Sequence, residues 1–65
     1  MEPWPDVLIV DDEKGLRFLR SEIFRLEGIA AKTLSDACQA VYYLNDVVKQ
    51  GGKMPRVVIL DVNMP

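Results

Sequence analysis

The chain alternates short, mostly apolar runs with longer segments in which apolar residues recur every three or four positions. The runs at residues 6–10 and 57–60 are rich in valine and isoleucine, which is typical of strands in a parallel sheet. A third run, at residues 29–33, is less apolar, as expected of an edge strand. Because residues 57–60 are apolar at every position, we expect both faces of that strand to be covered.

The first longer segment predicts a helix from residue 14 to about residue 27. Asp12 is the expected N-cap, and Gly28 fits the position just after the helix end. The apolar positions form one stripe that we expect to face the core, and its members are Leu16, Leu19, Ile23 and Leu26. The arginines of this segment are expected to lie on the solvent-exposed face; they are Arg17, Arg20 and Arg25.

The second longer segment predicts a helix that begins after Ser35, the expected N-cap, and ends before the Gly51-Gly52 pair. Its apolar stripe comprises Ala37, Val41, Leu44 and Val48, with Ala40 and Val47 beside it. Cys38, the only cysteine, lies in this helix among apolar neighbours. We therefore expect it to be a small buried hydrophobic side chain rather than a reactive thiol.

Strands and helices thus alternate in the order β-α-β-α-β. Helices of this length between strands predict right-handed parallel crossovers and an α/β fold. Residues 1–5 contain two prolines and are expected to form an irregular lead-in, in which Trp4 either folds back onto the domain or faces a partner. Residues 6–65 are expected to form one small domain.

The composition of the 65 residues narrows the function classes. The formal net charge is −2 and no basic face is evident, so we expect no direct binding of nucleic acid. No stretch reaches the ~18 apolar residues of a membrane helix, and the first residues lack the features of a signal peptide. A cytoplasmic location is therefore expected, without association with a membrane.

Acidic residues follow two of the predicted strands, Asp11 and Asp12 after the first and Asp61 after the third. The carboxyl ends of parallel strands meet at the ligand-binding edge of an open α/β sheet, so these carboxylates are expected to converge. Gathered carboxylates repel each other unless a cation neutralises them. The pattern predicts a hard divalent cation, Mg²⁺ by preference, held by carboxylate oxygens and water.

A carboxylate can also attack phosphorus and form an aspartyl phosphate. Asp61 is the expected nucleophile, because it ends the most apolar strand, which we expect to be central. Asp11 and Asp12 would then hold the metal, and Asn63 could offer its main-chain carbonyl to the same ion. The competing interpretations are structural: the acidic pair caps the first helix, and Asp61 starts a turn.

Two segments resemble the N-terminal signatures of the response-regulator receiver domain of two-component signalling, namely LIVDDE at residues 8–13 and VILDVNMP at residues 58–65. The resemblance implies a flavodoxin-like parallel sheet in which Asp61 takes a phosphoryl group from a histidine kinase or phosphotransfer protein. It also implies that Mg²⁺ is bound by the acidic pair and Asp61, with Asn63 ligating through its main chain. Such a module is not a metabolite enzyme, since only its own phosphorylation is expected.

The chain departs from the family pattern because it stops soon after the third of five expected strands. The Ser or Thr that ends strand four and the Lys that ends strand five are absent, so the resemblance is to the N-terminal half of a receiver. The third strand is then expected to have an open edge that invites pairing with another chain. We expect either a segment of a longer receiver or self-association through that strand.

Two other functions stay open at this point. Without the missing strands, the chain could be an interaction module that has lost phosphoryl transfer. A phosphohydrolase of the haloacid dehalogenase type also uses an aspartate nucleophile with Mg²⁺, but it requires a second aspartate two residues later, where this chain has Asn63. A nucleotide-binding loop is set aside, because residues 11–15 match neither glycine-rich phosphate-binding pattern.

Overall fold

The computed structural model describes residues 4–61 and contains the five predicted elements in the predicted order. Their bounds are β1 (Val7–Val10), α1 (Lys14–Leu26), β2 (Ala31–Leu34), α2 (Ala37–Lys49) and β3 (Val57–Leu60). Neither helix has the length and hydrophobicity that a crossing of the bilayer requires, as far as residues 4–61 are concerned.

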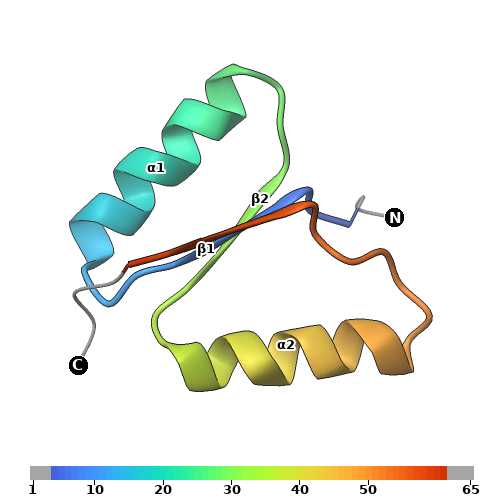
Figure 1. Ribbon diagram of the computed structural model, residues 1–65. Helices are drawn as coiled ribbons and strands as arrows, with labels where there is room; N and C mark the ends of the chain where they lie inside the picture. The colour runs from blue at the N-terminus through green and yellow to red at the C-terminus, as the bar shows by residue number, and fades with distance from the viewer. Residues whose placement is uncertain (1–3, 62–65) are drawn as a thin grey trace.

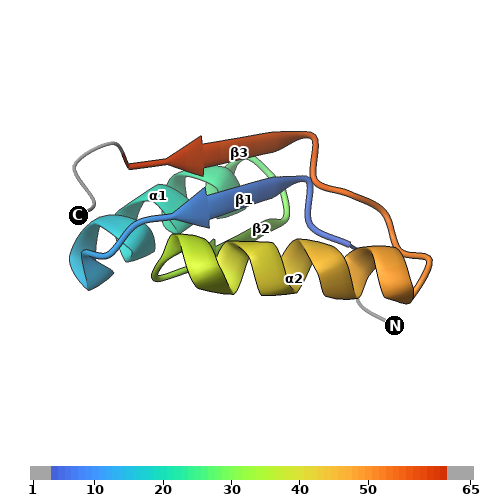
Figure 2. The same ribbon diagram turned by 60° about the horizontal axis from the view of Figure 1, so that its bottom comes forward.

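The three strands form one parallel sheet in the order β2-β1-β3, and the two helices lie on opposite faces of it (Figure 1). The α/β class and the flavodoxin-like strand order are therefore confirmed for this part of the fold. β1 lies between its neighbours, with Val7 opposite Ala31 of β2 and Val57 of β3 (Figure 2). The expectation that Asp61 ends the central strand is wrong within residues 4–61, because β3 pairs there with β1 alone.

The hydrophobic core is built around β1, whose four residues are all buried. Alternate side chains of a strand point to opposite faces, so Leu8 and Val10 share one face of the sheet. There they pack against Ala40 of α2, and the partly buried residues around them are Leu34, Tyr43 and Leu44. Ile9 is also fully buried and belongs to the opposite face, which α1 covers. The strand that is covered on both faces is thus β1.

The side of α2 that faces the sheet is shifted by about one residue from the predicted apolar stripe. Its buried residues are Ala40 and Val47, whereas Val41 and Val48 are exposed. The small side chain of Ala40 packs against Leu8 and Val10 of β1, so this side of the helix faces inward. Cys38 is exposed on the other side of the helix, so the expectation of a buried cysteine is wrong.

The predicted apolar stripe of α1 is mostly exposed to solvent. Leu19, Ile23 and Leu26 are each more than half exposed, and no residue of α1 is buried. The partly buried side of the helix includes polar residues instead, namely Arg17, Arg20, Ser21 and Glu22. Periodicity identifies an apolar stripe but does not say which surface the stripe packs against, and here the sheet contacts a different side.

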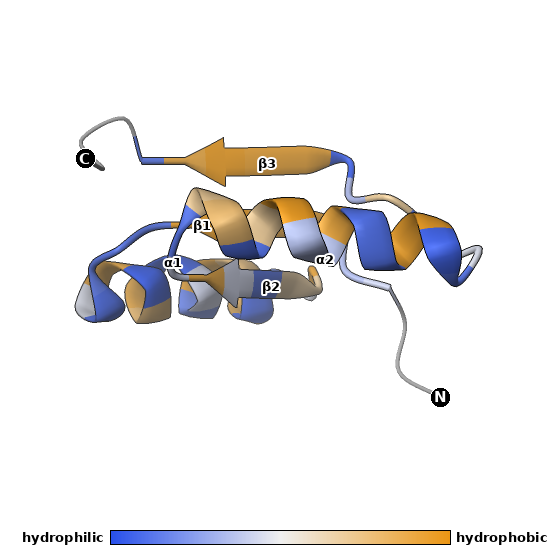
Figure 3. Cartoon of the chain, turned by 90° about the horizontal axis from the view of Figure 1, so that it is seen from below, coloured by the Kyte–Doolittle hydropathy of each residue, from blue (hydrophilic) through white to orange (hydrophobic). Residues whose placement is uncertain are grey.

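The strand β3 is exposed where its sequence predicts burial. The exposed fraction of the residue surface is 50% for Val57, 48% for Val58 and 54% for Leu60. Figure 3 shows this apolar strand to one side of α2, which lies over the rest of the sheet. The expected coverage of both faces is therefore absent within residues 4–61. Self-association through the open edge of β3 stays a prediction.

The helix α2 begins with a side-chain cap one residue later than predicted. Its N-cap is Asp36, whose Oδ1 accepts a hydrogen bond of 2.8 Å from the N–H of Gln39. Ser35 contributes only its main chain, whose N–H donates to Oε1 of Gln39 over 3.0 Å. At the end of α1, Gly28 adopts φ +74°, the left-handed conformation expected of a glycine that follows a helix.

The change Asp36→Ala is expected to lower the free energy of unfolding by about 1 kcal/mol, the usual cost of removing an N-cap side chain. Ser35→Ala is the matched control, because alanine keeps the main-chain hydrogen bond to Gln39 and should cost less than ~0.5 kcal/mol. Urea unfolding followed by circular dichroism measures both. A larger loss of the free energy of unfolding in Ser35→Ala than in Asp36→Ala would show that Ser35, the cap predicted from the sequence, is the true N-cap.

Trp4 folds back onto the domain, which settles the question that its sequence context left open. Its ring lies against Gly52, and a Cβ atom at that position would come within 2.5 Å of Cζ2 of the ring. Trp4 keeps 38% of its surface exposure, so the contact covers only part of the ring. Gly52 therefore provides the space that the lead-in needs to cross the loop after α2.

Candidate functional site

Three carboxylates meet at the sheet edge where β1 and β3 end. Asp11 directly follows β1 and Asp61 directly follows β3, and the N–H of Asp61 donates to the carbonyl oxygen of Val10 over 3.0 Å. One carboxylate oxygen from each of Asp11, Asp12 and Asp61 lies within 4.8 Å of the other two. Parallel strands bring their carboxyl ends to one edge, so residues fifty positions apart become neighbours.

Asp11 is fully buried, and hydrogen bonds fix both its main chain and its side chain. Its N–H donates to the carbonyl of Leu34 over 3.1 Å, and its own carbonyl accepts from Nη1 of Arg17 over 2.8 Å. Its Oδ1 accepts from the N–H of Glu13 over 2.9 Å. The carboxylate is thereby held in one orientation at the end of the central strand.

The second oxygen of Asp11 forms an ion pair with the first helix. Nη1 of Arg20 lies 3.0 Å from Oδ2 of Asp11. The two groups do not have hydrogen-bonding geometry, and Oδ2 is a buried oxygen that no donor among residues 4–61 reaches. The contact is thus electrostatic, and it leaves the lone pairs of Oδ2 available to another cation.

Arg17 and Arg20 contact the acidic cluster, which the sequence did not lead us to expect. Both were expected to face solvent, and both instead reach Asp11 from the partly buried side of α1. Their separation of three residues places them on one face of the helix, directly after the acidic pair. That spacing is the signal that could have identified them. Arg25, the third arginine of the helix, has an exposed side chain as expected.

Asp12 and Asp61 are more accessible than Asp11, since Asp12 is exposed and Asp61 is partly buried. The helix α1 has Glu13 at its N-cap, and no side chain of residues 4–61 caps it. The interpretation of Asp12 as the helix cap is therefore wrong, and its carboxylate contributes to the acidic cluster instead. Asn63, the remaining predicted ligand, lies outside the described residues.

The donor set of the cluster suits a hard divalent cation. Mg²⁺ prefers oxygen ligands, commonly one or two carboxylates, and keeps several water molecules. Asp11 supplies a buried oxygen that accepts no hydrogen bond from the described residues, and the exposed Asp12 leaves the site open to water. Three carboxylates lie within 4.8 Å of one another and Arg20 is paired with one of them, Asp11, so a further cation is favoured. The arrangement can therefore hold Mg²⁺.

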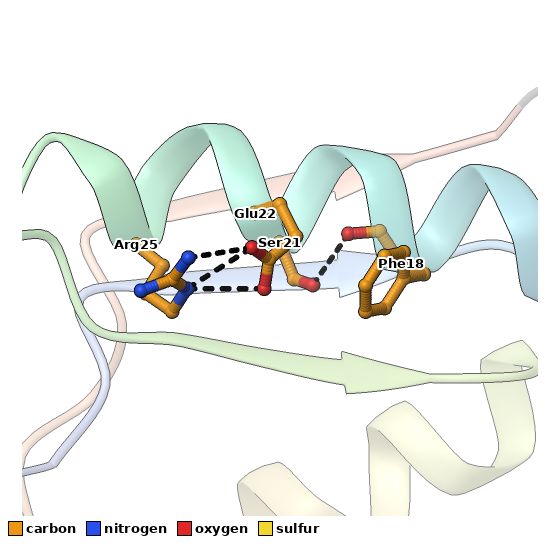
Figure 4. A network of polar contacts seen from close by, with 4 residues as sticks. All are labelled: Phe18, Ser21, Glu22 and Arg25. Carbon is orange, nitrogen blue, oxygen red and sulfur yellow. Dashed lines mark hydrogen bonds and ion pairs between the residues drawn. The ribbon is translucent and has the colours of Figure 1, made fainter.

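A second polar group lies on the surface of α1, away from the acidic edge (Figure 4). Arg25 forms hydrogen bonds of 2.7–3.1 Å with both carboxylate oxygens of Glu22, and these bonds lower the pKa of the Glu22 carboxyl from its ordinary value. The two residues line an open hollow near Pro5 and Ile29, at the amino-terminal end of the sheet. Because the pair neutralises itself, this group does not contribute charge to the acidic cluster.

Comparison with known proteins gave one clear similarity. The chain is 36% identical over 59 residues to sporulation initiation phosphotransferase F of Bacillus subtilis (strain 168), and the alignment covers 91% of this chain. The chain spans 43% of the length of that relative. No family model and no solved structure matched.

A parallel sheet of order 2-1-3, with an acidic pair after β1 and an aspartate after β3, is consistent with a signal-receiver type of α/β protein. The similarity in sequence agrees with this assignment over nearly the whole chain. The fold and this similarity support a response-regulator receiver domain over the part of the chain that the alignment covers.

Proposed function

We propose that the chain accepts a phosphoryl group on Asp61 in a Mg²⁺-dependent reaction, as a module of a two-component phosphorelay. The observation that best supports this proposal is the convergence of Asp11, Asp12 and Asp61 within 4.8 Å at one sheet edge. The relative from Bacillus subtilis is named a phosphotransferase, which is consistent with it. The donor is a phosphohistidine on a partner histidine kinase or phosphotransfer protein, since the chain contains no histidine.

Asp61 is the nucleophile in this proposal. One of its carboxylate oxygens forms a bond to phosphorus while the P–N bond of the donor breaks, and the electron pair of that bond stays on the imidazole nitrogen. The hydrogen bond from the N–H of Asp61 to Val10 ties the residue to the end of β1. Partial exposure lets a donor from another protein reach the carboxylate.

The acidic pair would hold the metal. Asp11, Asp12 and Asp61 would supply carboxylate oxygens, and Asn63 would add its main-chain carbonyl. Bound Mg²⁺ would neutralise charge on the carboxylates and on the phosphoryl oxygens, which is the main requirement of phosphoryl transfer. We further propose that the chain acts in signalling in the cytoplasm rather than turning over a metabolite, and that it binds neither nucleic acid nor a membrane.

Incubation with acetyl phosphate and Mg²⁺, read by intact mass, tests the function. We expect one phosphoryl group per chain, stable in acid and labile in base, and no uptake when a chelator removes Mg²⁺. The chain would be better described as an interaction module if, in excess Mg²⁺, it took up no phosphoryl group from acetyl phosphate or from a phosphorylated kinase. Repeated turnover of a phosphomonoester would instead indicate a hydrolase.

A further inference from the structure

We propose that Arg20 is an internal counter-ion that competes with Mg²⁺ for Asp11 and so sets the affinity of the acidic cluster for the metal. The inference rests on the proposed function, because it assumes that the cluster binds Mg²⁺. It adds a residue from the helix α1 to a site that the sequence patterns assign to the two strand ends alone. The basis is the ion pair of 3.0 Å between Nη1 of Arg20 and Oδ2 of Asp11.

The burial of the two partners explains why this ion pair forms. The side chain of Asp11 is completely buried, whereas that of Arg20 is 35% exposed. An ionised carboxylate without a compensating charge is costly in such a place. Arg20 supplies that charge from outside, because its long side chain reaches inward from the surface of the helix. Without metal, Asp11 therefore already has a cation beside it.

The two cations would use the same oxygen of Asp11. Oδ1 already accepts one hydrogen bond, from the N–H of Glu13, whereas Oδ2 accepts none from residues 4–61 and so has the greater capacity for a cation. Oδ2 is also the atom that the guanidinium of Arg20 approaches. A divalent cation ligated by Oδ2 would lie next to a fixed positive charge and be repelled by it. Metal binding therefore requires the guanidinium to move away, and its partial exposure gives it a path into solvent.

Arg17 has a different role, although it reaches the same residue. Its Nη1 donates to the main-chain carbonyl of Asp11 over 2.8 Å. That bond does not involve the carboxylate, so Arg17 can stay in place when a cation binds. The two arginines thus have different roles. Arg17 holds the end of β1 in position, and Arg20 neutralises the Asp11 carboxylate until a metal ion takes the place of Arg20.

The affinity for Mg²⁺ in Arg20→Gln tests the inference, measured by isothermal titration calorimetry on the purified protein. We expect the variant to bind Mg²⁺ about tenfold more tightly than the wild type, because a nearby positive charge has been removed. Arg25→Gln is the matched control: it removes the same charge from the same helix, but Arg25 pairs with the exposed Glu22. Its affinity should stay within about twofold of the wild type, since exposed charges at a distance are screened.

Urea unfolding gives a second readout that a merely structural role would not produce. Without metal, Arg20→Gln should be less stable than the wild type, because Asp11 is left buried without a counter-ion. Saturating Mg²⁺ should remove most of this difference, since the metal takes over the neutralisation. If the variant does not fold, nuclear magnetic resonance of arginine side chains in the wild type decides: Mg²⁺ should shift the Nε–H signal of Arg20 and leave that of Arg25 unchanged.

The outcomes separate this inference from the proposed function. Equal or weaker Mg²⁺ binding by Arg20→Gln, with phosphoryl uptake intact in the wild type, would overturn the inference alone. Failure of both proteins to bind Mg²⁺ would overturn the proposed function and the inference together. Binding by the variant at concentrations where the wild type binds little would support competition directly.

Discussion

The change Asp61→Asn is expected to abolish phosphoryl uptake from acetyl phosphate to the detection limit of intact mass spectrometry. Asparagine has nearly the same shape as aspartate, but its amide lacks the anionic oxygen that attacks phosphorus. The main-chain hydrogen bond from residue 61 to Val10 does not depend on the side chain, so the strand end should keep its geometry. The fold is checked by circular dichroism on the same sample.

Asp6→Asn is the matched control for this result. Asp6 lies just before β1, at the opposite end of the sheet from Asp61, and its carboxylate is 3.6 Å from Nζ of Lys53 on the protein surface. This variant should take up phosphate like the wild type. Uptake by Asp61→Asn at the wild-type level would move the phosphoacceptor to another carboxylate and contradict the assignment.

The change Leu8→Ala is expected to cost about 2–5 kcal/mol of the free energy of unfolding. Leu8 is completely buried in the cluster with Val10 and Ala40, so truncation leaves a cavity at the centre of the core. A chain of 65 residues has a total stability of only about 3–10 kcal/mol. The variant should therefore be largely unfolded in mild urea, as judged by circular dichroism.

Val58→Ala provides the comparison, because Val58 lies opposite Leu8 in the adjacent strand but is 48% exposed. Removal of half-exposed methyl groups should cost less than ~1 kcal/mol. If Val58→Ala lowered the free energy of unfolding as much as Leu8→Ala does, β3 would have to be covered in solution by another chain. The same pair of variants therefore also examines the predicted self-association through the open edge.

The order of elements and the meeting of the acidic residues could be predicted from the sequence, because both depend on local patterns and one general rule. Short apolar runs indicated strands, and parallel strands bring their carboxyl ends together. That rule sufficed to place Asp11 and Asp61 at one edge, as the structure has them. Neither residue required knowledge of how the helices pack.

The rotation of the helices could not be predicted in the same way. Both helices carry apolar residues on more than one side, so the period of the pattern fits several orientations. In α2 the small Ala40 packs against β1, and in α1 the side with Arg17 and Arg20 turns toward the acidic edge. These choices depend on contacts between elements far apart in the chain, which a pattern of neighbours does not contain.

The prediction of which strand is covered on both faces was also wrong, because this too depends on contacts between elements far apart in the chain. β1 and β3 are both apolar at every position, and nothing in their composition says which one has two neighbours. The structure buries β1 and leaves Val57 and Leu60 of β3 about half exposed. An apolar run therefore indicates a strand suited to an interior position, but its actual surroundings depend on which other strands and helices are present.

The central place of β1 has a consequence for how the protein is made on the ribosome. Val7 is synthesised fifty residues before its partner Val57, and at about 5–20 residues per second the delay amounts to roughly 3–10 s. During that interval one side of β1 has no strand beside it, and its four apolar residues are not yet covered on that side. Chaperones that bind exposed hydrophobic segments can therefore bind residues 7–10 before the edge with Asp11, Asp12 and Asp61 has formed.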